Sequence, residues 1–176
     1  MKSKLQIVFL ILLSTVLTAC GFHLRQSAFS DPSTIKSLYI QTSDPYSPLV
    51  KDLTQVLKNQ NIQLANTPNE AQYILTILNF NQTSTVTSVG FNTQIRQNLM
   101  IYTVEFEFKK NSFSSTAQDS ETTILLSPTQ VSAQRQYTQD NNQMLGSESE
   151  KQSIEHNLRQ DVIQRMLFRV SSALKG

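Results

Sequence analysis

The stretch from Leu99 to Phe108 constrains the fold more than any other part of the chain, because its apolar and polar side chains alternate. Successive side chains of a β-strand point to opposite faces of a sheet, so this alternation predicts a strand with one buried face. The predicted buried face carries Met100, Tyr102, Val104, Phe106 and Phe108, and the predicted solvent face carries Thr103, Glu105 and Glu107. The chain must therefore contain a sheet whose apolar face is covered by other elements.

The C-terminal segment supplies an apolar surface that can cover such a sheet. Apolar residues recur there every four positions, and Ile163 and Leu167 widen the stripe to the breadth of a core-facing helix. The recurring residues are Ile154, Leu158, Val162, Met166, Val170 and Leu174. Ser147 and Glu150 have the spacing of a capping box, which predicts that the helix begins there. Twenty or more helical residues would form a rod at least ~30 Å long.

The remaining elements are shorter. We predict a strand over 35–42, and a helix from the Ser47-Pro48 pair to about 59–61, because serine is a good N-cap and proline suits the first helical position. The segment 73–80 predicts a strand with Tyr73, Leu75 and Ile77 on one face and Ile74, Leu78 and Phe80 on the other, and 81–92 predicts strand ends and a hairpin loop.

The segments 122–126 and 130–137 predict the two halves of one strand, broken by Ser127-Pro128. A proline inside a strand favours a bulge or an edge position. Residues 109–120 predict a solvated turn. The expected fold class is therefore α/β (α+β), a two-layer sandwich of about four mostly antiparallel strands with two helices on one face, in the order β-α-β-β-β-α. One face of that sheet must meet water or a partner.

The N-terminus has the pattern of an export signal. Lys2 and Lys4 precede an apolar run over 5–17, whose thirteen residues are too few to span a hydrocarbon core of roughly 30 Å. Leu17-Thr18-Ala19-Cys20 resembles the lipobox of bacterial lipoproteins, in which the cysteine becomes the acylated N-terminus. We therefore expect a cleaved signal over 1–19, a lipidated tether over 20–33 and a single domain over 34–176. The alternative is a secreted protein whose cysteine lies near the cleavage site by chance.

Composition excludes several classes of protein. Without Lys2 and Lys4, the chain keeps 13 basic and 13 acidic residues and has no basic block, so we expect no nucleic-acid partner. One cysteine rules out an intrachain disulfide, and two histidines leave little for a metal cage, so we expect no metal and no cofactor. The chain is rich in uncharged polar residues: 21 Ser, 19 Gln, 17 Thr and 12 Asn.

No set of residues predicts catalysis. His23 and His156 lie in polar surroundings without a nucleophile nearby in sequence, and Glu105 and Glu107 are more simply the solvent face of a strand. Binding has better candidates. Arg96 lies at the start of the alternating strand and Arg135 on the apolar face of a later one, and an arginine fork suits a phosphate or carboxylate. The alternative is that each arginine stem only covers apolar surface.

The residues that follow the lipobox suggest a family. Cys20-Gly21-Phe22-His23-Leu24-Arg25, with Met100-Ile101-Tyr102-Thr103-Val104 and a long C-terminal helix, resembles the LPS-assembly lipoproteins of the LptE family. The resemblance implies a non-enzymatic outer-membrane lipoprotein, anchored through acyl chains on Cys20. Such a protein plugs the LptD β-barrel, helps that barrel to assemble and aids delivery of lipopolysaccharide to the cell surface. In this family the residue after the cysteine, here Gly21, permits passage to the outer membrane.

The resemblance also implies where lipopolysaccharide would be contacted. Family members carry basic residues on loops at the end of the sheet, and in this chain Phe91 and Ser147 stand near those positions. The basic residues nearest to them are Arg96 and Lys151, with Arg135 as a further candidate. Two other functions stay open: a free-standing, periplasm-facing lipoprotein carrier or adaptor that binds an anionic lipid, and, more weakly, a hydrolase using Glu105, Glu107 or His156.

Overall fold

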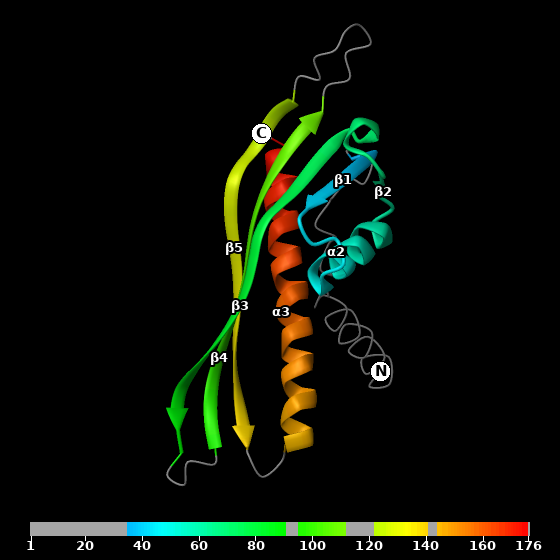
Figure 1. Ribbon diagram of the computed structural model, residues 1–176. Coiled ribbons are helices and arrows are strands. Elements are labelled where there is room, and N and C mark those ends of the chain that lie inside the picture. The colour runs from blue at the N-terminus through cyan, green and yellow to red at the C-terminus, as the bar shows by residue number, and fades with distance from the viewer. Residues whose placement is uncertain (1–34, 91–94, 112–121, 141–143, 176) are drawn as a thin grey trace, which may run out of the picture.

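Two layers, a sheet and a pair of helices packed on one of its faces, make up the described part of the chain (Figure 1). The computed structural model describes residues 35–90, 95–111, 122–140 and 144–175. In chain order the elements are β1 (Ser37–Thr42), α2 (Pro48–Asn59), β2 (Gln63–Leu64), the 3-10 turn η2 (Pro68–Glu70), β3 (Tyr73–Val89), β4 (Ile95–Asn111), β5 (Thr122–Asp140) and α3 (Met144–Ala173). The predicted α+β sandwich is confirmed.

The sheet has five strands in the order β2-β1-β3-β4-β5. β1 pairs in parallel with β2 and β3, whereas β3, β4 and β5 form an antiparallel meander. The predicted four strands become five because β2 has only two residues, paired with Ser37 and Leu38, and two residues are too few to show an alternating pattern.

The three meander strands are unusually long, with 17, 17 and 19 residues. They extend well past β1 and α2, and there α3 runs along one face of the sheet (Figure 1). We call this extension the arm and define it as residues 80–89 of β3, 95–104 of β4 and 131–140 of β5. Because the arm is three strands wide and has a helix on only one face, its other face lies open.

One hydrophobic core joins the sheet to both helices. The predicted alternation in β4 is confirmed, since all five apolar residues from Met100 to Phe108 are at most 5% exposed. The predicted stripe of α3 is confirmed as well, with Ile154 and Leu174 partly buried at its two ends. Its fully buried residues are Leu158, Val162, Ile163, Met166 and Leu167.

The first helix follows its sequence signals. The Ser47 side chain accepts a hydrogen bond of 3.4 Å from the backbone N–H of Val50, and Pro48 occupies the first turn. The helix ends at Asn59, and Asn61 then adopts a φ of 59°, a left-handed conformation that asparagine tolerates better than most residues. The predicted start and end of this helix are therefore confirmed.

The long helix begins earlier than predicted. α3 starts at Met144, so Ser147 lies within the helix, and the predicted capping box is wrong. Met144 and Leu145 are good helix formers, and a glycine such as Gly146 costs only about 1 kcal/mol inside a helix. Favourable neighbours therefore extend the helix past a residue that also suits a cap.

A bulge in β3 corrects the predicted faces of that strand. Pairing with β4 shifts between Ile77 and Asn79, so Leu78 is the extra residue and is 42% exposed. Beyond the bulge the alternation reverses, and Phe80, predicted to face away from Tyr73, packs against the core opposite Val104. Residues 81–89, predicted as strand ends and loop, continue as strand because threonine and valine favour extended backbone when a neighbouring strand pairs with them.

Pro128 lies at a bulge and also on an edge strand, the two positions expected from the sequence. β5 runs unbroken through Pro128, which lies at a register shift opposite the Phe106–Phe108 stretch of β4, and β5 is an edge strand. The predicted turn at 109–120 is wrong at its start, because β4 continues to Asn111. The Asn111 side-chain amide donates to the carbonyl oxygens of Pro68 and Ala71, at 3.0 and 3.2 Å, which holds the end of β4 against η2. Residues 112–121 lie outside the described residues.

Candidate functional site

The open face of the arm and its flank is built from uncharged polar side chains. Four rows of three residues cross β3, β4 and β5 on the face away from the helices. Among these twelve residues only Glu105 is charged, and only Leu99 and Ile101 are apolar. The rows are Asn79, Glu105 and Gln130; Asn81, Thr103 and Ser132; Thr83, Ile101 and Gln134; and Thr85, Leu99 and Gln136. We call these twelve residues the polar face.

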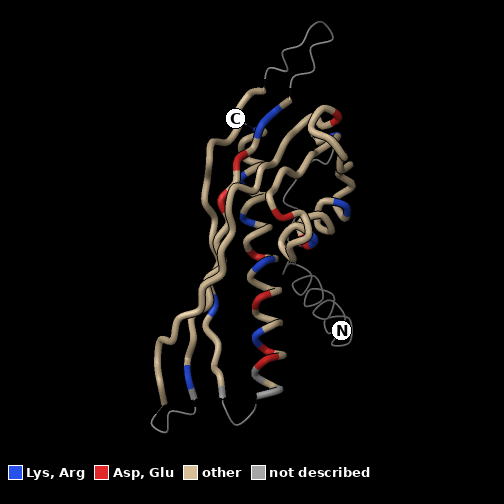
Figure 2. Tube along the Cα trace, viewed as in Figure 1, with Lys and Arg blue, Asp and Glu red and all other residues tan. Residues whose placement is uncertain are grey.

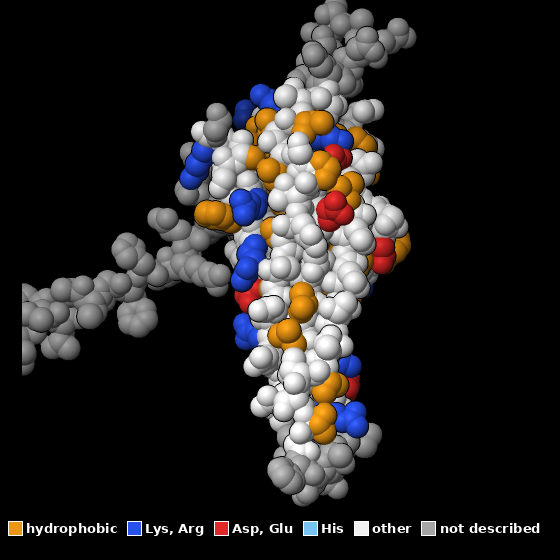
Figure 3. All heavy atoms as spheres, turned by 90° about the vertical axis from the view of Figure 1, so that its left-hand side faces the viewer, with side chains coloured by type: hydrophobic (Ala, Val, Ile, Leu, Met, Phe, Trp, Pro, Cys, Tyr) orange, Lys and Arg blue, Asp and Glu red, His pale blue; other side chains and the backbone are white. Residues whose placement is uncertain are grey.

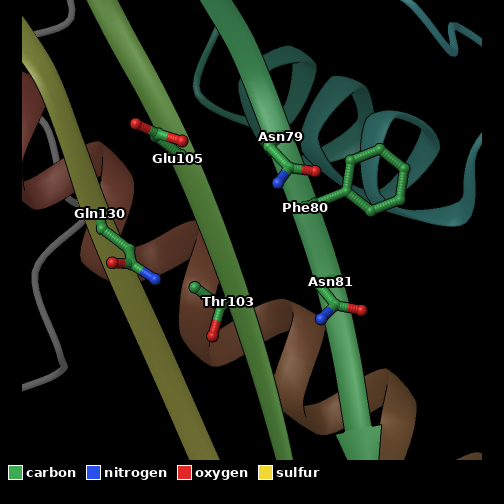
Figure 4. A pocket seen from close by; sticks show the side chains of 6 residues that line it. All are labelled: Asn79, Phe80, Asn81, Thr103, Glu105 and Gln130. Carbon is green, nitrogen blue, oxygen red and sulfur yellow. The ribbon is translucent and has the colours of Figure 1, made fainter.

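A hollow beside the first bulge of β3 lies on this polar face (Figure 4). It is lined by Asn79, Phe80, Asn81, Thr103, Glu105 and Gln130. In the close-up the Phe80 ring points away from the other five side chains, which leaves amides, a hydroxyl and a carboxylate around the hollow (Figure 4). Within the described part of the chain, none of these five polar side chains has a hydrogen-bond partner. They are therefore free to exchange water for the polar groups of a partner.

The opposite face of the arm turns polar toward its free end. The Gln82 amide donates to the Glu155 carboxylate of α3 at 2.9 Å, and the hydroxyls of Ser84 and Tyr137 lie 3.3 Å apart. Asn98 is 5% exposed and pairs with Gln139 across the strands at 3.5 Å. One of these hydrogen bonds joins the arm to α3, and the other two join strands of the arm to one another.

Of the three predicted cationic contacts, Arg135 lies apart from Arg96. The Arg135 guanidinium donates to Asp161 of α3 at 3.2 Å, so it already has a counterion. Arg96 pairs across the strands with Gln139, four residues along β5 from Arg135, which is roughly 13 Å at the rise of a strand. Arg135 and Arg96 therefore do not form one anion site.

Arg96 and Lys151 do lie toward the same end of the molecule. Lys151 precedes Asp161 by ten residues, roughly 15 Å along the helix, so both cations lie on the free-end side of the Arg135–Asp161 pair. Neither has an ion-pair partner among the described residues. Phe91 lies outside the described residues, and the side chain of Ser147 is likewise not described.

Sequence reasoning missed two valines beside Arg96. Val86 and Val89 are 47% and 52% exposed and pair with Asn98 and Arg96, so they share the helix-side face of the arm with these residues. The first bulge brings Val86 to that face, and the second, between Val86 and Ser88, brings Val89 to it as well. The bulges could not be read from alternation, but the valines themselves stood out as apolar residues in a Thr/Ser-rich segment. The free end of the arm is therefore cationic and apolar together.

A charged cluster joins the two helices at the root of the arm. Asp52 of α2 accepts from the Arg159 Nε at 2.9 Å, and the Nδ1 of His156 lies 3.6 Å from the same carboxylate oxygen. Burial raises the pKa of the nearby Tyr102 hydroxyl to about 12; Arg159 opposes this shift, while Asp52 and Glu155 add to it. His156 thus lies beside the Asp52–Arg159 ion pair between the two helices.

The other residues considered for chemistry are dispersed. The Lys109 ammonium forms an ion pair with Glu107, whereas Glu105 borders the hollow. Cys20 and His23 lie outside the described residues. Over the ranges that the structure describes, no three His, Cys, Asp or Glu side chains gather in a way that could hold a metal ion. None of the helices described is both long and apolar enough to cross a membrane.

The chain is similar to proteins of lipopolysaccharide assembly. The family described as LptE, Lipopolysaccharide-assembly, matches residues 35–170. The LPS-assembly lipoprotein LptE of Photorhabdus laumondii is 29% identical over 89 residues, which are 51% of this chain and 48% of the relative. This match therefore spans about half the length of that relative.

Solved structures share the fold. A lipoprotein B from Nitrosomonas europaea has a TM-score of 0.64 at 19% identity and covers 86% of this chain and 91% of its own. The rare lipoprotein B of Shewanella oneidensis has a TM-score of 0.61 at 19% identity, with 78% and 95% covered. A minor lipoprotein from Acinetobacter baumannii has a TM-score of 0.55 at 20% identity, with 78% and 94% covered. At these identities the likeness concerns the fold alone.

Proposed function

The chain belongs to the LptE family of lipopolysaccharide-assembly proteins, and from this we propose that it is an outer-membrane lipoprotein that plugs the LptD β-barrel, helps that barrel to assemble and aids delivery of lipopolysaccharide to the cell surface. The role is one of occupancy and positioning rather than catalysis. Acyl chains on Cys20 hold the protein to the membrane, residues 1–19 are the removed signal, and residues 20–33 are the tether. The arm, with its polar face, is the part that enters the barrel.

The polar face carries this proposal. The lumen of a large outer-membrane barrel is polar, so a plug must exchange hydrogen bonds with water for hydrogen bonds with the wall. Nine of the twelve residues of the polar face are Asn, Gln, Ser or Thr, and these side chains can both donate and accept. Figure 2 shows charged residues along α3, whereas long stretches of β3, β4 and β5 carry none. Few charges then need a partner when this face meets the wall.

We expect the tagged, full-length lipoprotein to recover LptD in a one-to-one complex from detergent-solubilised outer membranes. Gln134→Arg, in the middle of the polar face, should reduce the recovered barrel at least tenfold, because it places an unpaired charge against the wall, and ~1.4 kcal/mol corresponds to a factor of ten. Mass spectrometry and gel densitometry of the eluate measure both outcomes.

Gln55→Arg provides the matched control, since Gln55 is also exposed but lies on α2, and it should recover the wild-type amount of barrel. Circular dichroism melting curves establish that both variants fold. Recovery of the lipoprotein alone, or with bound lipid only, would contradict the plug and support the free-standing carrier. Equal recovery by Gln134→Arg would show that another face meets the barrel.

We further propose that the free end of the arm contacts the lipopolysaccharide phosphates through Arg96 and Lys151. These two cations lack counterions among the described residues, and the exposed Val86 and Val89 provide adjoining apolar surface for an acyl chain. We leave Arg135 out of this proposed site, because it already has Asp161 as a counterion. We therefore expect the lipid to contact the free end of the arm and not the part of β5 that carries Arg135.

Arg96→Ala combined with Lys151→Ala should weaken lipopolysaccharide binding by the purified full-length chain at least tenfold, because charge-assisted hydrogen bonds contribute about 1.5–3 kcal/mol each. Titration with fluorescent lipopolysaccharide measures the change in Kd. The control is Lys36→Ala with Lys58→Ala, two exposed cations away from the arm, which should bind as wild type. Equal losses in both double variants would mean that only net charge attracts the lipid.

A further inference from the structure

The C-terminal half of α3 presents an exposed ridge on the side away from the sheet. The ridge consists of Arg165, Phe168, Arg169 and Ser172 of α3, with Lys175 in the turn directly after the helix; all five are exposed, and Phe168 is 64% exposed. Met166, Leu167 and Val170, on the other side of the same turns, are buried in the core. The functions proposed above for the polar face and the free end of the arm do not involve this ridge.

The ridge carries unneutralised positive charge. Arg165, Arg169 and Lys175 have no ion-pair partner in the part of the chain that the structure describes, and no acidic residue follows Asp161 in the sequence. Figure 3 shows Lys and Arg side chains gathered along one side of the upper half of the molecule. Attraction to the negative end of the helix dipole falls off within the last turn. It can therefore stabilise the positive charge of Lys175 but not that of Arg165.

The ridge offers a partner little besides cations and one aromatic ring. The Ser172 hydroxyl donates to the Phe168 carbonyl oxygen at 2.9 Å, and Ser171 donates to the same oxygen at 3.0 Å, so both hydroxyls are occupied. Phe168 has Arg165 three residues before it and Arg169 directly after it. Exposed aromatic rings and basic side chains are two features of helices that lie on anionic membrane surfaces, and the ridge has both.

We propose that this ridge rests on an anionic phospholipid leaflet, with the Phe168 ring among the headgroups and the three cations on the phosphates. A single ring projecting from a convex ridge can be buried by a deformable headgroup layer, whereas a folded protein would need a matching pocket. Each basic side chain near an anionic leaflet strengthens association about fivefold. The inference rests on membership of a lipoprotein family and not on the barrel, so the two proposals can fail separately.

Docking through the ridge also gives the domain an orientation. The C-terminal end of α3 and the start of β1 lie at the same end of the molecule, opposite the free end of the arm (Figure 1). A ridge held at the leaflet therefore places the start of the described chain, which follows the proposed tether, near the membrane. The arm then points away from the docked end. Its free end stays available for the contacts proposed above.

Phe168→Trp tests the proposal directly, because the chain contains no tryptophan and the new indole is the only one. The full-length variant is reconstituted into vesicles of phosphatidylethanolamine and phosphatidylglycerol, or of phosphatidylcholine alone. In the anionic vesicles we expect emission at shorter wavelength and at least twofold quenching by brominated acyl chains, and in the neutral vesicles neither. Tyr46→Trp, at an 81% exposed position beside α2, should show no quenching in either.

Charge-reversal variants test whether the cations of the ridge are responsible for the docking. Arg165→Glu with Arg169→Glu, added to Phe168→Trp, should abolish the quenching, whereas Lys51→Glu with Lys58→Glu on α2 changes the net charge equally and should retain it. Quenching that survives reversal on the ridge, or is absent in anionic vesicles, would overturn the proposal. An indole of the Phe168→Trp variant that becomes shielded only in the presence of LptD would also overturn it and identify the barrel as the occupant. If the ridge variants still recovered the wild-type amount of LptD, failure of the membrane proposal would leave the plug proposal intact.

Discussion

Leu158→Asp is expected to destabilise the folded chain by roughly 3–5 kcal/mol, a large part of the stability of a typical domain. Leu158 is fully buried between α3 and the sheet, in the same core as Leu53 of α2. Aspartate there removes the apolar contacts of the leucine and buries a carboxylate with no cation placed to receive it. Thermal unfolding of the full-length chain in detergent, followed by circular dichroism, measures the loss as a lower Tm.

Asn157→Asp is the control for this prediction, because it introduces the same side chain one residue earlier at an exposed position. A surface substitution of this kind should change stability by no more than about 0.5 kcal/mol. If Leu158→Asp unfolded at the wild-type temperature, the assignment of the buried side of α3 would be wrong. Equal losses in both variants would mean that charge on the helix, and not burial, sets the effect.

Cys20→Ala is expected to abolish acylation and to leave residues 1–19 attached, because the thiol is the only group in the lipobox that can carry the diacylglycerol. At about 0.8 kcal/mol per buried CH₂, two or three acyl chains make anchoring stable, so this substitution removes the strongest attachment that we propose. Incorporation of labelled palmitate should fall to background, and the precursor should migrate more slowly on a gel than the mature protein.

Ser27→Ala, in the proposed tether, should be labelled and cleaved as wild type. Full palmitate labelling of Cys20→Ala would refute the lipobox, because no other cysteine is present. Normal cleavage without label in the wild type would instead identify an ordinary secreted protein. The second outcome would leave the fold and its family membership intact, since the family match covers residues 35–170.

Short-range patterns predicted the elements whose environment is uniform along their length. β4 is buried on one face from Met100 to Phe108, and α3 packs on one core from Leu158 to Val170, so the periods of two and of about four are unbroken. The Ser47-Pro48 start of α2 was also predictable, because an N-cap acts within its own turn. The family was predicted from the residues around Cys20, which lie outside the described residues, and the family match over residues 35–170 confirmed it.

The residues of the candidate site were much harder to predict from the sequence. The two bulges in β3 change which face each side chain occupies, and a bulge depends on the register with β4, not on β3 alone. For this reason Phe80 was assigned to the wrong face and Val86 and Val89 were overlooked. Arg135 was selected as a cation but is neutralised by Asp161, which lies 26 residues away in sequence.

The sequence by itself determined the secondary structure of β4, α2 and most of α3, because each depends on residues a few positions apart. Only the tertiary structure decided the length of β3 and the reach of the arm, since polar strands such as 81–89 form only when a partner strand satisfies their backbone groups. It also decided which cations are free. A counterion is a neighbour in space: Asp52 pairs with Arg159 and Asp161 with Arg135, whereas Arg96, Lys151 and the cations of the ridge have no ion-pair partner among the described residues.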